Sequence, residues 1–299
     1  LTNSLIIFNT ATRGGGGGIS NDVNGSLTIS NTAVVSNSTD RGGGGIHTLG
    51  HLVVINSDIL SNTARYWGAG ILQDRGTLDV RNSTIQGNRC NSTGGGLVNR
   101  SAASLNQVTF SGNAATRIGY PGAGGAILTE GTMTLTNCTI SGNVADSGAA
   151  ISNSGVRLMI ASTTIVSNRV TPGRTGPGGI NNYGTITAAN TIIANNDNDN
   201  CVTHSGTIHS AGHNLDSGTT GGVSAIGDVG DTDPLIGPLR DSGGHPASSG
   251  EPPWTHALIA GSPAIDAGGN VGCPATDQRG VVRPVDGDLD KLAKCDIGA

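Results

Sequence analysis

The chain has 299 residues and a formal net charge of −5, and only 12% of its residues are charged. Because no basic stripe is present, we predict that nucleic acid is not a partner. Because no run of about 18 or more apolar residues occurs, we predict no transmembrane segment in this chain. Glycine contributes 50 residues, a fraction that could indicate disorder, but the apolar residues recur at a regular period, which indicates a folded repeat protein.

The most regular feature of the sequence is a seven-residue phrase, Asn-Ser-Thr-Ile-Gln-Gly-Asn at 82–88, which returns in close variants along the first two thirds. The copies are 25 to 30 residues apart, and their final asparagines are Asn9, Asn37, Asn62, Asn88, Asn113, Asn143, Asn168 and Asn196. An internal repeat of this period predicts a solenoid, which grows by adding rungs and does not close around one globular core.

Each repeat contains three short apolar segments. The first follows a glycine cluster, as Leu97 follows Gly94–Gly96, the second alternates apolar and polar residues, as in Leu78–Val80, and the third is the phrase itself, with Ile85 at its centre. Alternation with a period of two and many β-branched residues predict strands and not helices. We therefore predict an all-β fold, a right-handed parallel β-helix of the pectate-lyase type, with three short strands per rung of about 25 residues.

The final asparagines, Asn9 to Asn196, are predicted to form a structural ladder. Asparagine tolerates the left-handed conformation of tight corners, and its side chain can bond to the rungs on either side. The glycine clusters precede strands and lack a Gly-Lys-Ser/Thr sequence, so we interpret them as corners and not as phosphate-binding loops.

The texture of the sequence changes near Asp228, and we assign 1–226 to the β-helix repeats and 227–299 to an irregular, Pro- and Gly-rich C-terminal cap continuous with the solenoid. Cys273 and Cys295 flank the end of this segment and could pair, which suits an oxidising, extracellular setting. The total of five cysteines leaves at least one thiol free.

The C-terminal segment also carries a series of short motifs, at Gly237–Leu239, Asp241, Gly243-Gly244, His256–Leu258, Gly261–Gly268, Asp277–Gly280, Arg283-Pro284 and Cys295–Ala299. In these motifs it resembles the bacterial surface-protein family called choice-of-anchor Q. The upstream repeats are similar to those of polymorphic outer-membrane and other adhesin-like β-helix proteins. The resemblance implies an exported, surface-attached β-helix whose attachment signal lies beyond Ala299.

Two charged groups are candidate sites. Asp286, Asp288 and Asp290 have the spacing of a calcium loop, although Lys291 replaces the usual glycine, and the alternative is a solvated acidic turn. Asp74, Arg100 and Glu130 follow equivalent apolar residues of three consecutive rungs. An acid–base–acid column of this kind is a weak candidate for catalysis, and the alternative is that the three charges pair with one another.

The aromatic residues Tyr66, Trp67 and Tyr120 fall in longer loops, where they could form a platform for surface glycans. The function that we predict is that of an exported, extracellular or cell-surface structural or adhesive protein and not that of an enzyme. The alternative is a carbohydrate-active enzyme, a polysaccharide lyase or glycoside hydrolase, or a glycan-binding protein on the same scaffold. The first rung, Asn3–Asn9, presents an unpaired edge, so end-to-end self-association into a filament is a further expectation.

Overall fold

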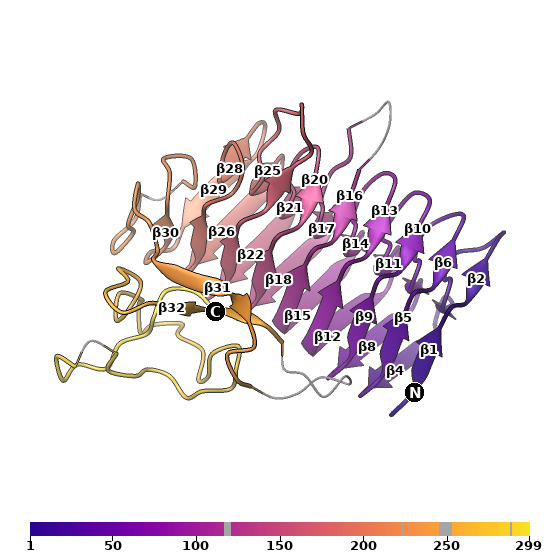
Figure 1. The fold of residues 1–299 in the computed structure, drawn as a ribbon, viewed down its shortest axis with the longest axis horizontal. Helices are drawn as coiled ribbons and strands as arrows, with labels where there is room; N and C mark the ends of the chain where they lie inside the picture. The colour runs from indigo at the N-terminus through magenta and orange to yellow at the C-terminus, as the bar shows by residue number, and fades with distance from the viewer. Residues whose placement is uncertain (117–120, 223, 245–252, 288) are drawn as a thin grey trace.

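A computed structural model describes residues 1–116, 121–222, 224–244, 253–287 and 289–299. The described residues form parallel strands stacked as a β-solenoid of about 8 turns, with ~25 residues per turn, and they contain no helix. This confirms the predicted β-helix. In Figure 1 the rungs lie side by side along the long axis of the molecule, and the C-terminal segment folds back against one side of them. A helix long and apolar enough to cross a membrane is not found among the described residues.

The first strand of each rung belongs to an eight-stranded parallel sheet, which we call the first column. Its strands are β3 (Ile19–Asn21), β7 (Ile46–Thr48), β11 (Ile71–Gln73), β14 (Leu97–Asn99), β17 (Ile127–Thr129), β21 (Ile151–Asn153), β25 (Ile180–Asn182) and β28 (Cys201–Thr203).

The second and third strands of the rungs form two columns of one larger sheet. The second column contains β4 (Ser26–Ser30), β8 (His51–Ile55), the first halves of β12 (Thr77–Gln86) and β15 (Ala102–Ser111), β18 (Thr132–Thr136), β22 (Arg157–Ala161), β26 (Thr185–Ala189) and β29 (Thr207–Ser210). The third column contains β1 (Leu5–Ile7), β5 (Ala33–Val35), β9 (Asp58–Leu60), the second halves of β12 and β15, β19 (Thr139–Ser141), β23 (Thr164–Val166), β27 (Ile192–Ala194) and β30 (Leu215–Asp216).

A fourth column of two-residue strands, which the sequence did not indicate, follows the final asparagine of each phrase. It contains β2 (Thr10–Ala11), β6 (Ser38–Thr39), β10 (Thr63–Ala64), β13 (Arg89–Cys90), β16 (Ala114–Ala115), β20 (Val144–Ala145) and β24 (Arg169–Val170). The three predicted strands per rung are therefore present, and this fourth strand turns the chain back toward the glycine cluster of the next rung.

The core is a set of aliphatic stacks that run along the axis of the solenoid. In the first column Ile71 pairs in register with Ile46 and Leu97, and in the third column Ile85 pairs with Ile59 and Phe110. All six side chains are fully buried. Burying one such side chain contributes about 1.5–3 kcal/mol, so the register of the repeat is fixed by burial and a slip of one residue would expose a whole stack.

The glycine clusters lie where neighbouring rungs come closest. A Cβ placed on Gly45 would lie 2.7 Å from the carbonyl oxygen of Gly70, and one on Gly96 would lie 2.7 Å from that of Ala126. Both distances are below van der Waals contact, so this position favours the smallest residues, and the equivalent residues on the two rungs after Gly96 are Ala126 and Ala150.

The left-handed residues are not the final asparagines of the phrases, so that part of the prediction is wrong. Positive φ angles occur at the first residue of the phrase, as in Asn31 (48°) and Asn82 (45°), and at the residue before the final asparagine, as in Ser61 (53°) and Gly87 (66°). Short polar residues and glycine tolerate this conformation best. Each phrase therefore contains two sharp corners, one on either side of the third strand.

The final asparagines point inward and form a continuous hydrogen-bonded column. Asn62 is typical: its Nδ2 donates to Oδ1 of Asn88 (3.0 Å) and to the carbonyl oxygen of Val34 (2.9 Å), and its backbone N–H donates to the same Oδ1 of Asn88 (2.9 Å). The column extends from Asn9 to Asn196 and ends on Asn200. Because a buried amide without partners costs about 1–3 kcal/mol, these bonds allow the asparagines to be buried.

Most of the C-terminal segment lies along the side of the solenoid. Val229 extends the last rung by pairing with Leu215, and backbone hydrogen bonds from His213 to Ile226 and from Thr232 to Asp216 continue this contact. The hairpin of β31 (Ile236–Arg240) and β32 (Thr255–Leu258) and the residues after it cover the outer face of the third column. Cys273 and Cys295 are joined by a disulfide within this segment.

Polar side chains attach the segment to successive rungs. Thr139 donates through its hydroxyl to Gln278 Oε1 (2.6 Å), and Gln278 Nε2 donates to Thr109 Oγ1 (2.7 Å). Two rungs farther on, the Asn190 side chain donates to the carbonyl oxygen of Gly269 and accepts from its N–H. The outer face of the third column is thereby buried over its C-terminal rungs.

Candidate binding surfaces on the solenoid

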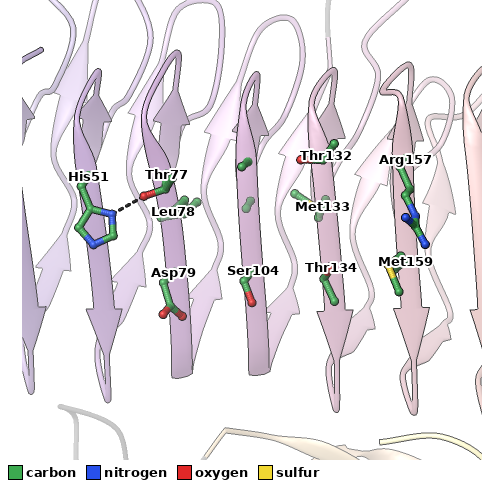
Figure 2. A pocket seen from close by; sticks show the side chains of 12 residues that line it. His51, Thr77, Leu78, Asp79, Ser104, Thr132, Met133, Thr134, Arg157 and Met159 are labelled. Atoms are coloured by element: carbon green, nitrogen blue, oxygen red, sulfur yellow. Dashed lines mark hydrogen bonds between the residues drawn. The ribbon is translucent and has the colours of Figure 1, made fainter. Parts of the chain in front are cut away.

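The outer face of the second column is hollowed by a groove of about 540 Å³, which we call the trough (Figure 2). It crosses five rungs, from β8 to β22, and Figure 2 shows its side chains standing in rows across neighbouring strands. The lining residues are His51, Thr77, Leu78, Asp79, Ala102, Ala103, Ser104, Thr132, Met133, Thr134, Arg157 and Met159.

The trough crosses β15 where that strand carries small residues. Ala102 stands in register between Thr77 and Thr132, and Ser104 between Asp79 and Thr134. On the inner row Ala103 takes the place that larger residues occupy on the neighbouring strands. Because strand residues alternate between the two faces, three consecutive small residues thin both faces of the sheet at one rung.

The chemistry of the trough is neutral in the middle and charged at the sides. Hydroxyl groups line its floor, and Asp79 is engaged by Arg81 through two hydrogen bonds, of 2.9 and 2.5 Å. On the opposite side Arg157 is exposed, and it makes no ion pair within the described ranges. Met159, which is 37% exposed, adds an apolar wall beside Arg157. The surface thus offers rows of hydroxyls, one available cation and apolar contact.

A second group of side chains lies where the first column ends, and we call it the corner cluster: His47, Trp67, Asp74, Arg100 and Glu130. Arg100 bonds to Asp74 through Nη1 (2.5 Å) and to Glu130 through Nε (3.0 Å). His47 Nε2 lies 2.8 Å from the other oxygen of Asp74. The structure therefore brings the predicted column together, and it adds His47, which alignment of the repeats does not indicate.

These contacts determine the state of Asp74. Burial raises the pKa of its carboxyl, but hydrogen bonds and charges from His47 and Arg100 together outweigh burial and hold the pKa below its usual 3.8. A carboxylate that is held ionised by two partners is a poor general acid or base at neutral pH. The geometry corresponds to the alternative in which the charges pair with one another.

The aromatic residues of the corner lie beside this ion-paired chain. The guanidinium of Arg100 lies 5.3 Å from the centre of the Trp67 ring, and that ring lies 5.4 Å from Tyr66. Trp67 is 39% exposed, but Arg100 and Tyr66 already contact its ring. Tyr120, the third aromatic of the predicted platform, lies outside the described residues.

The acidic loop of the C-terminal segment does not assemble into a metal site within the described residues. Asp286 accepts a hydrogen bond from the backbone N–H of Lys291, and Asp290 accepts one from that of Leu292. Asp288 lies outside the described residues. Among the residues that the structure describes, no group of three His, Cys, Asp or Glu side chains could hold a metal ion.

The three cysteines outside the disulfide are Cys90, Cys138 and Cys201, and all are buried in the solenoid. Burial raises the pKa of each thiol to about 12. Since the thiolate is the reactive form, these residues act as small core side chains and not as nucleophiles.

One known family matches part of the chain. Residues 107–130 match the Chlamydia polymorphic membrane protein repeat. This stretch contains the phrase Gln107–Asn113, the short strand β16 and strand β17 of the next rung. No curated protein and no solved structure matches the chain.

Proposed function

We propose that this protein is a surface-displayed, adhesin-like β-solenoid that binds an extended glycan chain in the trough. The observation that carries the proposal is the trough itself, a groove of about 540 Å³ that runs across five rungs. Its hydroxyl rows repeat at the spacing of parallel strands, about 4.8 Å. Hydroxyls stand on three neighbouring rungs, at Thr77, at Ser104 and at Thr132 with Thr134, so a polymer with hydroxyl groups at regular intervals can contact one on each of these rungs.

The placement at the cell surface is supported by the matched repeat, which is named for membrane proteins of Chlamydia. The disulfide between Cys273 and Cys295 agrees with an oxidising compartment. Antibody labelling of intact cells, compared with permeabilised cells of the source organism, tests this part of the proposal. Labelling that appears only after permeabilisation would contradict it.

Binding is favoured over catalysis by the state of the acidic residues. Asp74 and Glu130 are ion-paired with Arg100, and Asp79 in the trough is engaged by Arg81. Glycoside hydrolysis needs two carboxyl groups in different protonation states on either side of the scissile bond. The trough offers one acid, and that acid has a guanidinium partner.

The decisive experiment is a glycan array followed by titration of the best ligand against variants of the trough. Ser104→Trp places a large side chain on the floor at β15, and Arg157→Gln removes the available cation. We expect Ser104→Trp to abolish binding. We expect Arg157→Gln to lower the affinity for acidic ligands by about tenfold, the effect of one charge-assisted hydrogen bond.

Thr28→Trp is the matched control, because Thr28 stands in the same outward row as Val53 and Asp79 but lies outside the trough. If Ser104→Trp and Thr28→Trp bind alike, the trough is not the glycan site. End-to-end association of solenoids remains a separate prediction. Electron microscopy of native material tests it, and uniform short rods would rule it out.

A further inference from the structure

The C-terminal segment contains a second cavity, independent of the trough, which we call the arginine pocket. It has a volume of about 210 Å³, several times the roughly 30 Å³ that one water occupies in the liquid. Its walls come from β32, from the Asp277–Arg283 turn and from the last residues of the segment, and they include Ala257, Arg279, Arg283 and Asp296. The pocket is polar and lies beside the solenoid.

Arg283 is a charged group of the pocket with open hydrogen-bond donors. Its Nη1 donates to the carbonyl oxygen of Gly298 (3.1 Å) and contacts the Cys295 sulfur. Its Nε and Nη2 make no hydrogen bond or ion pair with the residues that the structure describes. Burial lowers the pKa of Arg283, and the carboxylates of Asp277 and Asp296 act in the opposite direction. The guanidinium is half-buried, and its open donors are not among the buried atoms without a partner, so they can bind an acceptor that enters the cavity.

The nearby charges do not satisfy this arginine. Asp277 is 3% exposed and forms an ion pair with Arg279. The Nε and Nη2 atoms of Arg279 lie 2.8 and 2.6 Å from Oδ2 of Asp277. Asp296 lines the same cavity without pairing with Arg283, and one of its oxygens accepts the backbone N–H of Asp266. Burial raises the pKa of Asp296, with the N–H of Asp266 and the charge of Arg283 opposing it.

We propose that the arginine pocket binds a small hydroxy carboxylate, with the carboxylate on Arg283 and a hydroxyl donating to Asp296. The open fork of Arg283 matches the two oxygens of a carboxylate, which is the geometry that distinguishes arginine from lysine. The carboxyl of Asp296 supplies an acceptor on the same cavity. The same chemistry occurs in a free hydroxy acid and in a uronic acid residue of a glycan.

Isothermal titration of the full chain with lactate, glucuronate and glucose tests the proposal. We expect at least one of the two acids to bind at millimolar concentration and glucose, which lacks the carboxylate, not to bind. Tighter binding of glucuronate identifies a glycan residue as the source, and tighter binding of lactate identifies a free acid. Failure of both acids to bind, or equal binding of glucose, would overturn the proposal.

Variants locate the site. Arg283→Lys keeps the positive charge and removes the fork, and Asp296→Asn keeps an acceptor for Asp266 and removes the charge. We expect about a tenfold loss of affinity for the first variant and a smaller loss for the second. Ala257→Leu reduces the volume of the cavity and leaves Arg283 unsubstituted, so it tests the site even if Arg283→Lys fails to fold. Arg240→Lys, on the exposed face of β31, is the control, and losses equal to those of the control would contradict the assignment.

Discussion

The outer faces of the second and third columns have the same construction and different neighbours. Both present short hydroxyl side chains in register on neighbouring rungs, such as Ser104 and Thr134 in the second column and Thr109 and Thr139 in the third. The third face is covered by the C-terminal segment, so Thr109 and Thr139 are almost fully buried. The second face is open, and the trough lies on it.

The covered face shows how such a row holds an extended chain. Thr109 donates to the carbonyl oxygen of Trp254, and Gln278 bridges Thr109 and Thr139 on adjacent rungs. The C-terminal segment is therefore held by the hydroxyls of two adjacent rungs. The open face also carries hydroxyl side chains, and the C-terminal segment does not cover them. We therefore place the proposed glycan ligand on this face.

The largest expected effect comes from removing the support beneath these faces. Phe110 is fully buried on β15, the ten-residue strand that spans both columns. Phe110→Ala is expected to lower the free energy of unfolding by about 3–5 kcal/mol, measured by urea denaturation. Met159→Ala, on the wall of the trough, is the control and is expected to stay within about 0.5 kcal/mol. A loss below about 1 kcal/mol for Phe110→Ala would contradict the packing described.

A matched pair of substitutions separates the two faces directly. Thr134 and Thr139 lie on the same rung, Thr134 open in the trough and Thr139 beneath the C-terminal segment. Thr139→Val leaves the buried Gln278 Oε1 without its donor, and we expect it to cost about 1–3 kcal/mol. Thr134→Val, read in the same denaturation experiment, is expected to cost less than about 0.5 kcal/mol. Equal costs would show that the segment does not depend on the hydroxyl row.

The smallest expected effect is a pH dependence of the covered face. His256 on β32 donates from Nδ1 to the carbonyl oxygen of Gly237 (2.7 Å), so its Nε2 accepts from the Ser141 hydroxyl (2.9 Å) when the ring is neutral. Burial lowers the pKa of His256 below its usual 6.5, although the Gly237 carbonyl opposes this. The folded protein therefore binds fewer protons than the unfolded chain at this residue.

Stability from His256 is complete above pH 6.5 and is lost as the pH falls from there through the pKa of the folded state. We expect the melting temperature to decrease over this window, and the decrease to be smaller in His256→Gln. His209→Gln, on the exposed part of β29, should leave the profile unchanged. An unchanged profile in His256→Gln would assign the pH dependence to other groups.

The parts of the structure that could be predicted from the sequence are those that repeat. The Ile and Asn of each phrase recur with the rung, and parallel pairing places every copy on the next, so Ile85 meets Phe110 and Asn88 meets Asn113. Pairing within the Asp74–Arg100–Glu130 column was also open to prediction, because the three residues hold equivalent positions.

Features that depend on one rung or on distant contacts could not be predicted. The trough exists because Ala102, Ala103 and Ser104 happen to stand together on β15. His47 reaches Asp74 from a different position of its rung, so alignment of the repeats does not pair them. The C-terminal segment finds Thr109 and Thr139 more than a hundred residues away, and no local pattern encodes a contact of that range.

The asparagine column has an electrical consequence. One Nδ2–H of each asparagine donates to the next asparagine toward the C-terminal rungs, from Asn9 to Asn200, so the amide dipoles add head to tail as peptide dipoles do in a helix. Bonds in series also polarise one another. The positive end of this column lies at Asn200, whose Nδ2 donates to the buried carboxylate of Asp216. A negative charge thus stands where the field favours it, and the rod acquires an axis with two unlike poles.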